Sequence, residues 1–200
     1  QGIAGQGPIS CAADLDGDGR PELIAGRTAY EFTGTVTAGT FSGAVRWSSP
    51  VTDGYCGIAN MDEDPAPEVV LVSEGMVYIL DAQDGSVVAS LSVPGTGNGG
   101  APNIADFDGD GRPDIGTAGA DYYVVMRYVG GSTLEVIWQA PTEDDSSHRT
   151  GSSVFDFDGD GRAEVVYNDE EYLRIYPGVE PDCLLDPPGP ACDGLMTDDE

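Results

Sequence analysis

Lysine is absent from this chain and basic residues are scarce: eight arginines stand against 36 acidic residues in a sequence of 200. The formal net charge is −28. A charge of this sign repels phosphate backbones and anionic lipid headgroups, so it excludes binding to nucleic acid and to anionic membrane surfaces. It also destabilises a compact fold by self-repulsion. Four divalent cations would reduce it to about −20, so we expect cations to be part of the folded state.

Long apolar runs are also missing, since no stretch approaches the ~20 residues that a membrane-spanning helix needs. We therefore expect no membrane insertion. Histidine occurs once, as His148 in a polar connector. With 36 carboxylates in the chain, an acidic pair carries no information about catalysis. Because the sequence contains no arrangement of nucleophile and base, we expect a protein that is not an enzyme.

Cysteine is limited to Cys11, Cys56, Cys183 and Cys192, at spacings that do not match a zinc site. Cys183 and Cys192 bracket a proline-rich stretch that a bridge could close, and Cys11 and Cys56 occupy nearly the same place in two successive repeats. We expect disulfides, and hence a secreted or cell-surface protein in an oxidising compartment. The start at Gln1, without a Met or an apolar signal region, is typical of a processed product or of a piece of a longer protein.

What is abundant is an acidic motif that recurs four times, at residues 14–22, 60–68, 106–114 and 156–164. Three copies share the pattern Asp-x-Asp-Gly-Asp-Gly-Arg, and the copy at 60–68 diverges from it. The motif starts are separated by 46, 46 and 50 residues. A period this regular indicates a repeat architecture.

The segments that flank the motifs are typical of β-strands. Short stretches of small and apolar residues precede the four copies, at Ile9–Ala13, Gly57–Ala59, Asn103–Ala105 and Ser153–Phe155. Apolar, often β-branched runs follow them, at Leu23–Ala25, Val69–Val72, Ile115–Thr117 and Val165–Tyr167. Further strands are expected at Met76–Leu80 and Ser86–Leu91, joined by a turn at Asp81–Gly85. No stretch shows the 3.6-residue apolar period of a helix.

Each period thus contains about four short antiparallel strands, the signature of a β-propeller blade. The expected fold class is all-β, with blades of four antiparallel strands and calcium loops, in four repeats. Calcium is expected because it binds six to eight oxygens at about 2.3–2.6 Å, which carboxylates at alternate positions of a tight turn supply. Position 6 of the motif is Gly in three copies, which permits the sharp turn.

The candidate ligands occupy motif positions 1, 3, 5 and 9 through side chains and position 7 through the backbone oxygen. In the first loop they are Asp14, Asp16, Asp18, Arg20 and Glu22. In the second they are Asn60, Asp62, Asp64, Ala66 and Glu68. In the third they are Asp106, Asp108, Asp110, Arg112 and Asp114. In the fourth they are Asp156, Asp158, Asp160, Arg162 and Glu164. Because the carboxylates would repel one another without an ion, metal binding and folding should be coupled.

The EF-hand is the main alternative for these loops. An EF-hand needs a bidentate Glu at position 12 and flanking helices, whereas position 12 here is Ala25, Leu71, Thr117 or Tyr167 and the flanks are strand-like. The second loop replaces the first Asp by Asn60 and the Gly by Pro65. We expect ions in loops one, three and four. The second loop is left open, with weaker affinity if it binds an ion.

The run Asn103–Ile115 resembles the FG-GAP repeat that integrin α-chain propellers share with bacterial VCBS-type secreted proteins. The likeness extends to about Gly178 and is closer to the bacterial branch, because the Gly-Ala-Pro of the integrin repeat is replaced by Ala25-Gly26 and Ala118–Ala120. This resemblance implies blades around a central axis, with calcium in the loop between the first two strands of each blade. It implies no integrin-like ligand recognition.

The expected organisation is four blade repeats over 1–178, at about 1–52, 53–98, 99–148 and 149–178, followed by a Pro- and Asp-rich tail over 179–200 with a local disulfide. Members of the family that the sequence resembles usually carry about seven blades. The last repeat also has no obvious fourth strand after Tyr172–Tyr176. Three arrangements stay open: a fragment of a larger propeller, a four-bladed ring completed by Gln1–Gly7, or an open edge completed by another subunit.

The expected function is that of a calcium-stabilised extracellular structural or adhesive module that mediates protein interaction or assembly, as a filament or surface-protein subunit. The alternative is a non-catalytic carbohydrate-targeting module that accompanies a secreted enzyme. The aromatic residues of the strand patterns, such as Trp47, Trp138 and Tyr123, are expected to pack between blades. Expected partners are a protein or a second copy of the chain, or else a glycan.

Overall fold

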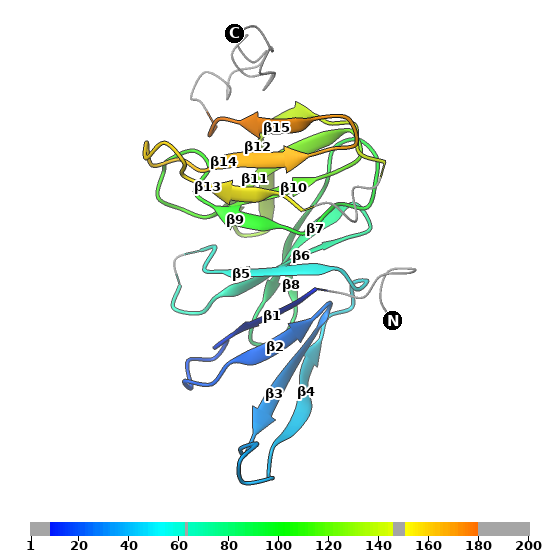
Figure 1. Ribbon diagram of the computed structural model, residues 1–200. Coiled ribbons are helices and arrows are strands. Elements are labelled where there is room, and N and C mark those ends of the chain that lie inside the picture. Colours follow the sequence, from blue (N-terminus) through cyan, green and yellow to red (C-terminus); the bar gives the residue numbers. More distant parts are fainter. Residues whose placement is uncertain (1–8, 63, 146–150, 180–200) are drawn as a thin grey trace, which may run out of the picture.

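The computed structural model describes residues 9–62, 64–145 and 151–179. Over these residues the chain forms fifteen β-strands in four antiparallel sheets, which follow one another along the molecule (Figure 1). The predicted all-β class and the repeat of blade-like sheets are confirmed. In the described part of the chain, no helix is long and apolar enough to cross a membrane.

Each sheet is a simple meander in which consecutive strands pair. The first sheet contains β1 (Ser10–Ala13), β2 (Glu22–Ala25), β3 (Thr28–Thr33) and β4 (Ser42–Ser48). The second contains β5 (Tyr55–Ala59), β6 (Glu68–Ser73), β7 (Met76–Asp81) and β8 (Val87–Ser92). The third contains β9 (Asn103–Ala105), β10 (Asp114–Ala118), β11 (Tyr122–Gly130) and β12 (Thr133–Pro141). The fourth contains β13 (Ser153–Phe155), β14 (Glu164–Asn168) and β15 (Leu173–Tyr176).

The acidic motifs occupy the connections between the first and second strands of the sheets. In every sheet the second strand begins at motif position 9, which is Glu22, Glu68, Asp114 or Glu164. The predicted turn between β7 and β8 is also present: Gly85 donates its amide hydrogen to Asp81 O over 2.8 Å. The predicted strands therefore agree with the structure to within one or two residues at their ends.

Alternation along the strands places side chains on the two faces of every sheet, and one central row of paired residues represents each face. The forward rows, which face the next sheet along the chain, are Cys11–Ile24–Ala29–Trp47, Gly57–Val70–Ile79–Ala89, Asn103–Gly116–Val125–Trp138 and Ser153–Val166–Ile175. The backward rows, on the opposite faces, are Ala12–Leu23–Tyr30–Val45, Ile58–Val69–Leu80–Val87, Ile104–Ile115–Met126–Val136 and Val154–Val165–Tyr176. A register shift separates the two rows in the third strand of each of the first three sheets, at Ala29/Tyr30, Ile79/Leu80 and Val125/Met126.

The core consists of three clusters, each lying between neighbouring sheets. In each cluster the forward row of one sheet packs on the backward row of the next, as Ile24 does with Val69 and Val70 does with Ile115. The third cluster contains Tyr123, Trp138 and Tyr176, with the Trp138 and Tyr176 ring centroids 5.1 Å apart. Full burial of one such side chain stabilises the fold by about 1.5–3 kcal/mol. The aromatic residues predicted to pack between blades do so.

A single disulfide is seen among the described residues, between Cys11 and Cys56, with the two Cα atoms 6.1 Å apart. It links β1 to β5, the first strands of two successive sheets. The similar place of the two cysteines in successive repeats thus brings them together in space. Cys183 and Cys192, together with their expected bridge, lie outside the described residues.

The four sheets do not close into a ring, since the first and the fourth lie at opposite ends of the array (Figure 1). The four-bladed ring is therefore not the arrangement of the described residues, and Gln1–Gly7, its expected closing strand, lies outside them. The fourth sheet has three strands in the described part of the chain, as expected from the sequence. The tail over 180–200 and His148 also fall outside the described residues.

Candidate metal centres

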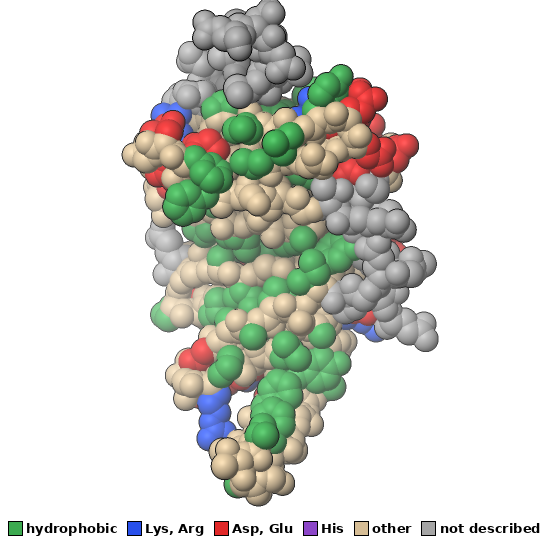
Figure 2. Space-filling view, viewed as in Figure 1, with side chains coloured by type: hydrophobic (Ala, Val, Ile, Leu, Met, Phe, Trp, Pro, Cys, Tyr) green, Lys and Arg blue, Asp and Glu red, His purple; other side chains and the backbone are tan. Residues whose placement is uncertain are grey.

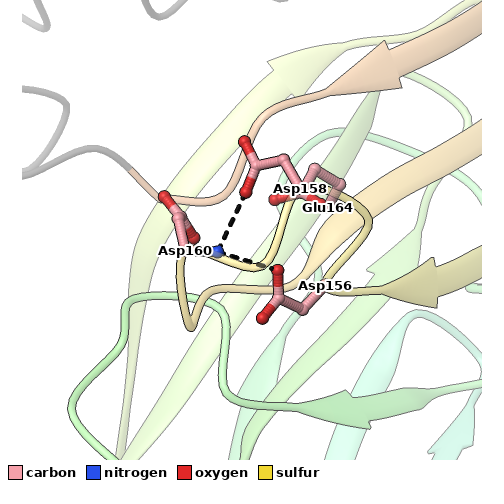
Figure 3. Close-up of side chains that lie close together, drawn as sticks. All are labelled: Asp156, Asp158, Asp160 and Glu164. Carbon is pink, nitrogen blue, oxygen red and sulfur yellow. Dashed lines mark hydrogen bonds between the residues drawn. The ribbon is translucent and has the colours of Figure 1, made fainter.

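The fourth loop gathers four carboxylates on one side of a tight turn. Oxygens of Asp156, Asp158, Asp160 and Glu164 all lie within 4.8 Å of one another, and the side chains converge from the loop and from the start of β14 (Figure 3). Such a set of hard oxygen donors suits a divalent cation such as calcium. In this loop the four predicted side-chain ligands come together.

Hydrogen bonds to the first Asp of the motif hold this loop in shape. Asp156 accepts amide hydrogens from Gly159 over 2.6 Å, from Asp160 over 3.1 Å and from Gly161 over 3.0 Å. Gly161 has φ of +95°, a conformation in which residues with a Cβ are strained. The first and third loops repeat the pattern at Asp14 and Asp106. These carboxylates are therefore positioned by hydrogen bonds from the loop backbone.

A second contact closes each loop at its base. The position 9 carboxylate accepts the amide hydrogen of position 2 in all four loops: Leu15 to Glu22, Met61 to Glu68, Phe107 to Asp114 and Phe157 to Glu164, at 2.8, 2.6, 3.3 and 2.6 Å respectively. All four acids are buried. Since a buried carboxylate needs compensation beyond one hydrogen bond, a cation next to it would be stabilising.

Asp114 gives the clearest test of whether a metal ion fits. Its side chain is fully buried, yet Oδ1 has no hydrogen-bond partner among the described residues. Burial raises the pKa of Asp114 to about 7, and the nearby carboxylates Asp110 and Asp106 add to that rise. A buried carboxylate oxygen that accepts no hydrogen bond and lies beside two further acids has the position and the chemistry of a metal ligand.

The third loop also contains a cation that the sequence analysis missed. Arg127, on β11, pairs with Asp108, and its Nε lies 4.0 Å from Asp110 Oδ2 and 3.7 Å from Asp114 Oδ1. Oxygens of Asp106, Asp108 and Asp114 lie within 4.8 Å of one another, and Asp110 is not part of that group. No local signal in the sequence identifies Arg127, because the contact depends on the strand register that returns β11 past the loop.

The first loop is partly neutralised in the same way. Arg46 Nη1 lies 2.6 Å from Asp16 Oδ2, and this hydrogen bond lowers the pKa of Asp16. Oxygens of Asp14, Asp16 and Asp18 lie within 4.8 Å of one another. The predicted fourth carboxylate, Glu22, is not part of that group. It is the hydrogen-bond acceptor at the base of the loop.

The second loop differs as its sequence suggests. Pro65 at position 6 has no amide hydrogen, so the hydrogen bond that Gly19 makes in the first loop cannot form here. The Asn60 side chain instead donates to the Asp64 backbone oxygen. Oxygens of Asp62, Asp64 and Glu68 nevertheless lie within 4.8 Å of one another, and burial raises the pKa of Glu68 to about 7. The remaining carboxylates of the second loop could thus hold an ion.

Every loop therefore contains at least three carboxylates that could hold a metal ion. The predicted backbone ligands, the carbonyl oxygens of Arg20, Ala66, Arg112 and Arg162, stay predictions. So do the identity of the ion and the number of sites filled.

Comparison with known proteins identifies the repeat. A model of the FG-GAP-like repeat matches residues 60–117 and 106–167, which together span more than half of the chain. No curated protein matches the sequence. The crystal structure of the V. cholerae biofilm matrix protein Bap1 is similar over 86% of this chain and 53% of that protein, at 15% identity and a TM-score of 0.55.

An Agrocybe aegerita lectin described as recognising non-reducing terminal N-acetylglucosamine is similar over 85% of this chain and 48% of its own, at 16% identity and a TM-score of 0.55. This chain thus spans about half the length of either structure. At such identities the likeness concerns the fold alone. The tandem match of the repeat model over the acidic loops and their strands shows that the chain belongs to the FG-GAP-like repeat family.

Proposed function

We propose that this chain is a calcium-stabilised, extracellular and non-catalytic module that mediates adhesion or assembly through protein contacts. The observation that carries the proposal is the acidic loop repeated at the same connection in four successive sheets. An acidic loop that recurs in every sheet is better suited to a structural role than to catalysis at a single site.

Calcium would be held by the carboxylates that lie within 4.8 Å of one another in each loop. These are positions 1, 3 and 5 in the first loop, 3, 5 and 9 in the second, 1, 3 and 9 in the third, and 1, 3, 5 and 9 in the fourth. A bound ion would supply positive charge to carboxylates that otherwise repel one another. Its binding free energy would add to the free energy of unfolding, because the unfolded chain does not hold these oxygens together. Asp114, whose buried Oδ1 accepts no hydrogen bond among the described residues, supports this coupling most directly.

The extracellular setting is supported by the Cys11–Cys56 disulfide, since such bonds persist in oxidising compartments. The adhesive role is supported by the fold shared with a biofilm matrix protein. The acidic surface favours calcium-rich surroundings, in which bound ions reduce self-repulsion.

Adhesion can be tested with beads coated with the protein. We expect the beads to aggregate, or to adhere to surfaces coated with extracellular matrix proteins, in calcium but not after chelation. Beads coated with a variant carrying Asp156→Asn, Asp158→Asn and Asp160→Asn should adhere less. A folded, calcium-loaded protein that adheres to nothing in these assays would contradict the proposed function.

Carbohydrate binding is the second candidate, and the fold shared with a lectin favours it. The chain would then serve as a carbohydrate-targeting module of a secreted enzyme. A glycan array probed in calcium and in chelator distinguishes the two candidates. Calcium-dependent hits favour carbohydrate binding, whereas adhesion to protein surfaces without any hit favours the first proposal.

A further inference from the structure

The three interfaces between sheets follow one rule. The forward row of each sheet packs on the backward row of the next, and the central residues of the packed backward rows are 0–2% exposed: Val69, Leu80, Ile115, Met126, Val165 and Tyr176. The packed forward rows are equally buried at Ile24, Val70 and Val125. Within residues 9–179, as far as the structure describes them, two rows have no neighbouring sheet, one at each end of the array.

The first unpaired row is the backward row of the first sheet, Ala12–Leu23–Tyr30–Val45. Leu23 and Tyr30 are half-buried, whereas the matching residues of the next two sheets are fully buried. Val45 is 59% exposed, against 40% and 36% for its counterparts Val87 and Val136. The same face continues into a hollow of about 460 Å³ lined by Leu23, Phe32 and Phe41 among others. The first sheet therefore presents an apolar, partly concave face.

The second unpaired row is the forward row of the fourth sheet, Ser153–Val166–Ile175. Ile175 is 41% exposed, and Phe155 and Leu173, on the same face, are 65% and 67% exposed. Hydrophobic side chains lie on the surface over β13–β15 at one end of the molecule and over the β3–β4 hairpin at the other (Figure 2). Exposed apolar patches of this kind mark interaction surfaces.

We propose that the two faces bind each other between two copies of the chain, with the fourth sheet of one copy packed on the first sheet of the next. This names the partner in the assembly that the proposed function invokes, and so it rests on that function. The two faces correspond to the two sides of the interface, forward row on backward row, that occurs three times between successive sheets of the chain. Neither unpaired row contains a charged residue, although the net charge of the chain is −28. The charged residues beside these rows are Arg20 and Glu22 at the hollow of the first sheet and Glu164, the register partner of Phe155, on the fourth.

Such a contact joins two different surfaces, so it is heterologous. It closes into a ring if the rotation between copies allows it, and otherwise it extends into a filament. A symmetric contact of one face with its own copy would not repeat the forward-on-backward rule. An experiment that alters one face at a time can therefore distinguish the heterologous contact from a symmetric one.

The test uses Val45→Arg on the first face and Ile175→Arg on the second. Both residues are already exposed, so each variant should fold, which circular dichroism melts in calcium verify. Sedimentation velocity should show concentration-dependent self-association of the wild type, weakened about tenfold or more in each variant. Val129→Arg is the matched control: Val129 is 55% exposed on β11, outside both faces, and should associate like the wild type.

Mixing the two variants is the decisive step. Val45→Arg retains an intact fourth-sheet face and Ile175→Arg an intact first-sheet face, so the mixture should form a one-to-one complex that neither forms alone. A monomeric wild type, association that neither variant weakens, or a mixture that forms no complex would each overturn the proposal. Those results leave bead adhesion to matrix-coated surfaces and the glycan assay unaffected, so the proposed function would be judged separately.

Discussion

Arg127 Nε lies 3.7 Å from Asp114 Oδ1, a fully buried oxygen that accepts no hydrogen bond among the described residues. The guanidinium carries one positive charge and a calcium ion would carry two, so the guanidinium and the ion compete for the carboxylates of the third loop. We predict that Arg127→Met lowers the melting temperature of the metal-free protein and raises calcium affinity at this loop several-fold, on the order of 1 kcal/mol. Calorimetric titration of both proteins measures the change. Unchanged affinity would show that Arg127 and the ion do not compete.

The pH dependence of the metal-free protein follows from two buried acids. Burial raises the pKa of Asp114 and of Glu68 to about 7. Their pKa values in the unfolded chain are about 3.9 and 4.3, so between these values and about 7 the folded state binds more protons. Stability without metal should therefore fall as pH rises from about 5 to about 8.

With calcium the trend should reverse, so that stability rises with pH, because protons compete with the ion for the same oxygens. Thermal melts at about pH 5 and about pH 8, each with calcium and with a chelator, measure both trends. The variant Asp114→Asn should flatten the metal-free trend. A metal-free protein that becomes more stable as the pH rises would contradict the roles given to Asp114 and Glu68.

The sequence alone predicted the loops and their strands because each depends on short-range patterns. Alternate aspartates and a Gly at position 6 predict a tight turn, and the turn appears in the structure with Gly161 at positive φ. The β-branched runs after the loops predict strands, and β6 and β14 are found there. The fold class could therefore be read from one period of the repeat.

Contacts that depend on register could not be predicted in this way. Arg127 reaches Asp114 because β11 returns beside β10, and a pattern of residue types does not specify that pairing. The Trp47 indole N–H donates to the Ala82 backbone oxygen in the next sheet over 2.8 Å, which requires the sheets to be placed relative to one another. The sequence indicated an open edge strand. For the described residues, the structure adds two sheet faces that no further sheet covers, at the ends of the array.

The glycine at position 6 provides a test of the loop conformation. Gly161 has φ of +95° and free space around its Cα, so Gly161→Ala adds backbone strain without a clash. We expect a loss of about 1–2 kcal/mol in the free energy of unfolding, measured by urea denaturation in saturating calcium. Gly151→Ala is the control, because Gly151 also has free space but no positive φ, and it should change little. Equal effects of the two substitutions would exclude strain at position 6 as the cause.

The Cys11–Cys56 disulfide should contribute to stability by restricting the unfolded chain. The bonded residues are 45 apart in sequence, and closing a loop of that length corresponds to about 4 kcal/mol in the chain-entropy treatment. Reduction should lower the urea midpoint in a Cys183→Ser, Cys192→Ser background, where this disulfide alone responds to the reductant. Adding Cys11→Ser and Cys56→Ser should abolish the response. A midpoint that reduction leaves unchanged would refute the contribution.

The central claim, that the acidic loops bind calcium and that this binding stabilises the fold, is tested most directly by a calcium titration that records bound ions and melting temperature together. Native mass spectrometry should count three or four calcium ions per chain, since three carboxylates in each loop lie within 4.8 Å of one another. The melting temperature should rise as the ions bind and fall again with chelator. A protein that binds no calcium, or that binds it without any change in melting temperature, would contradict the account.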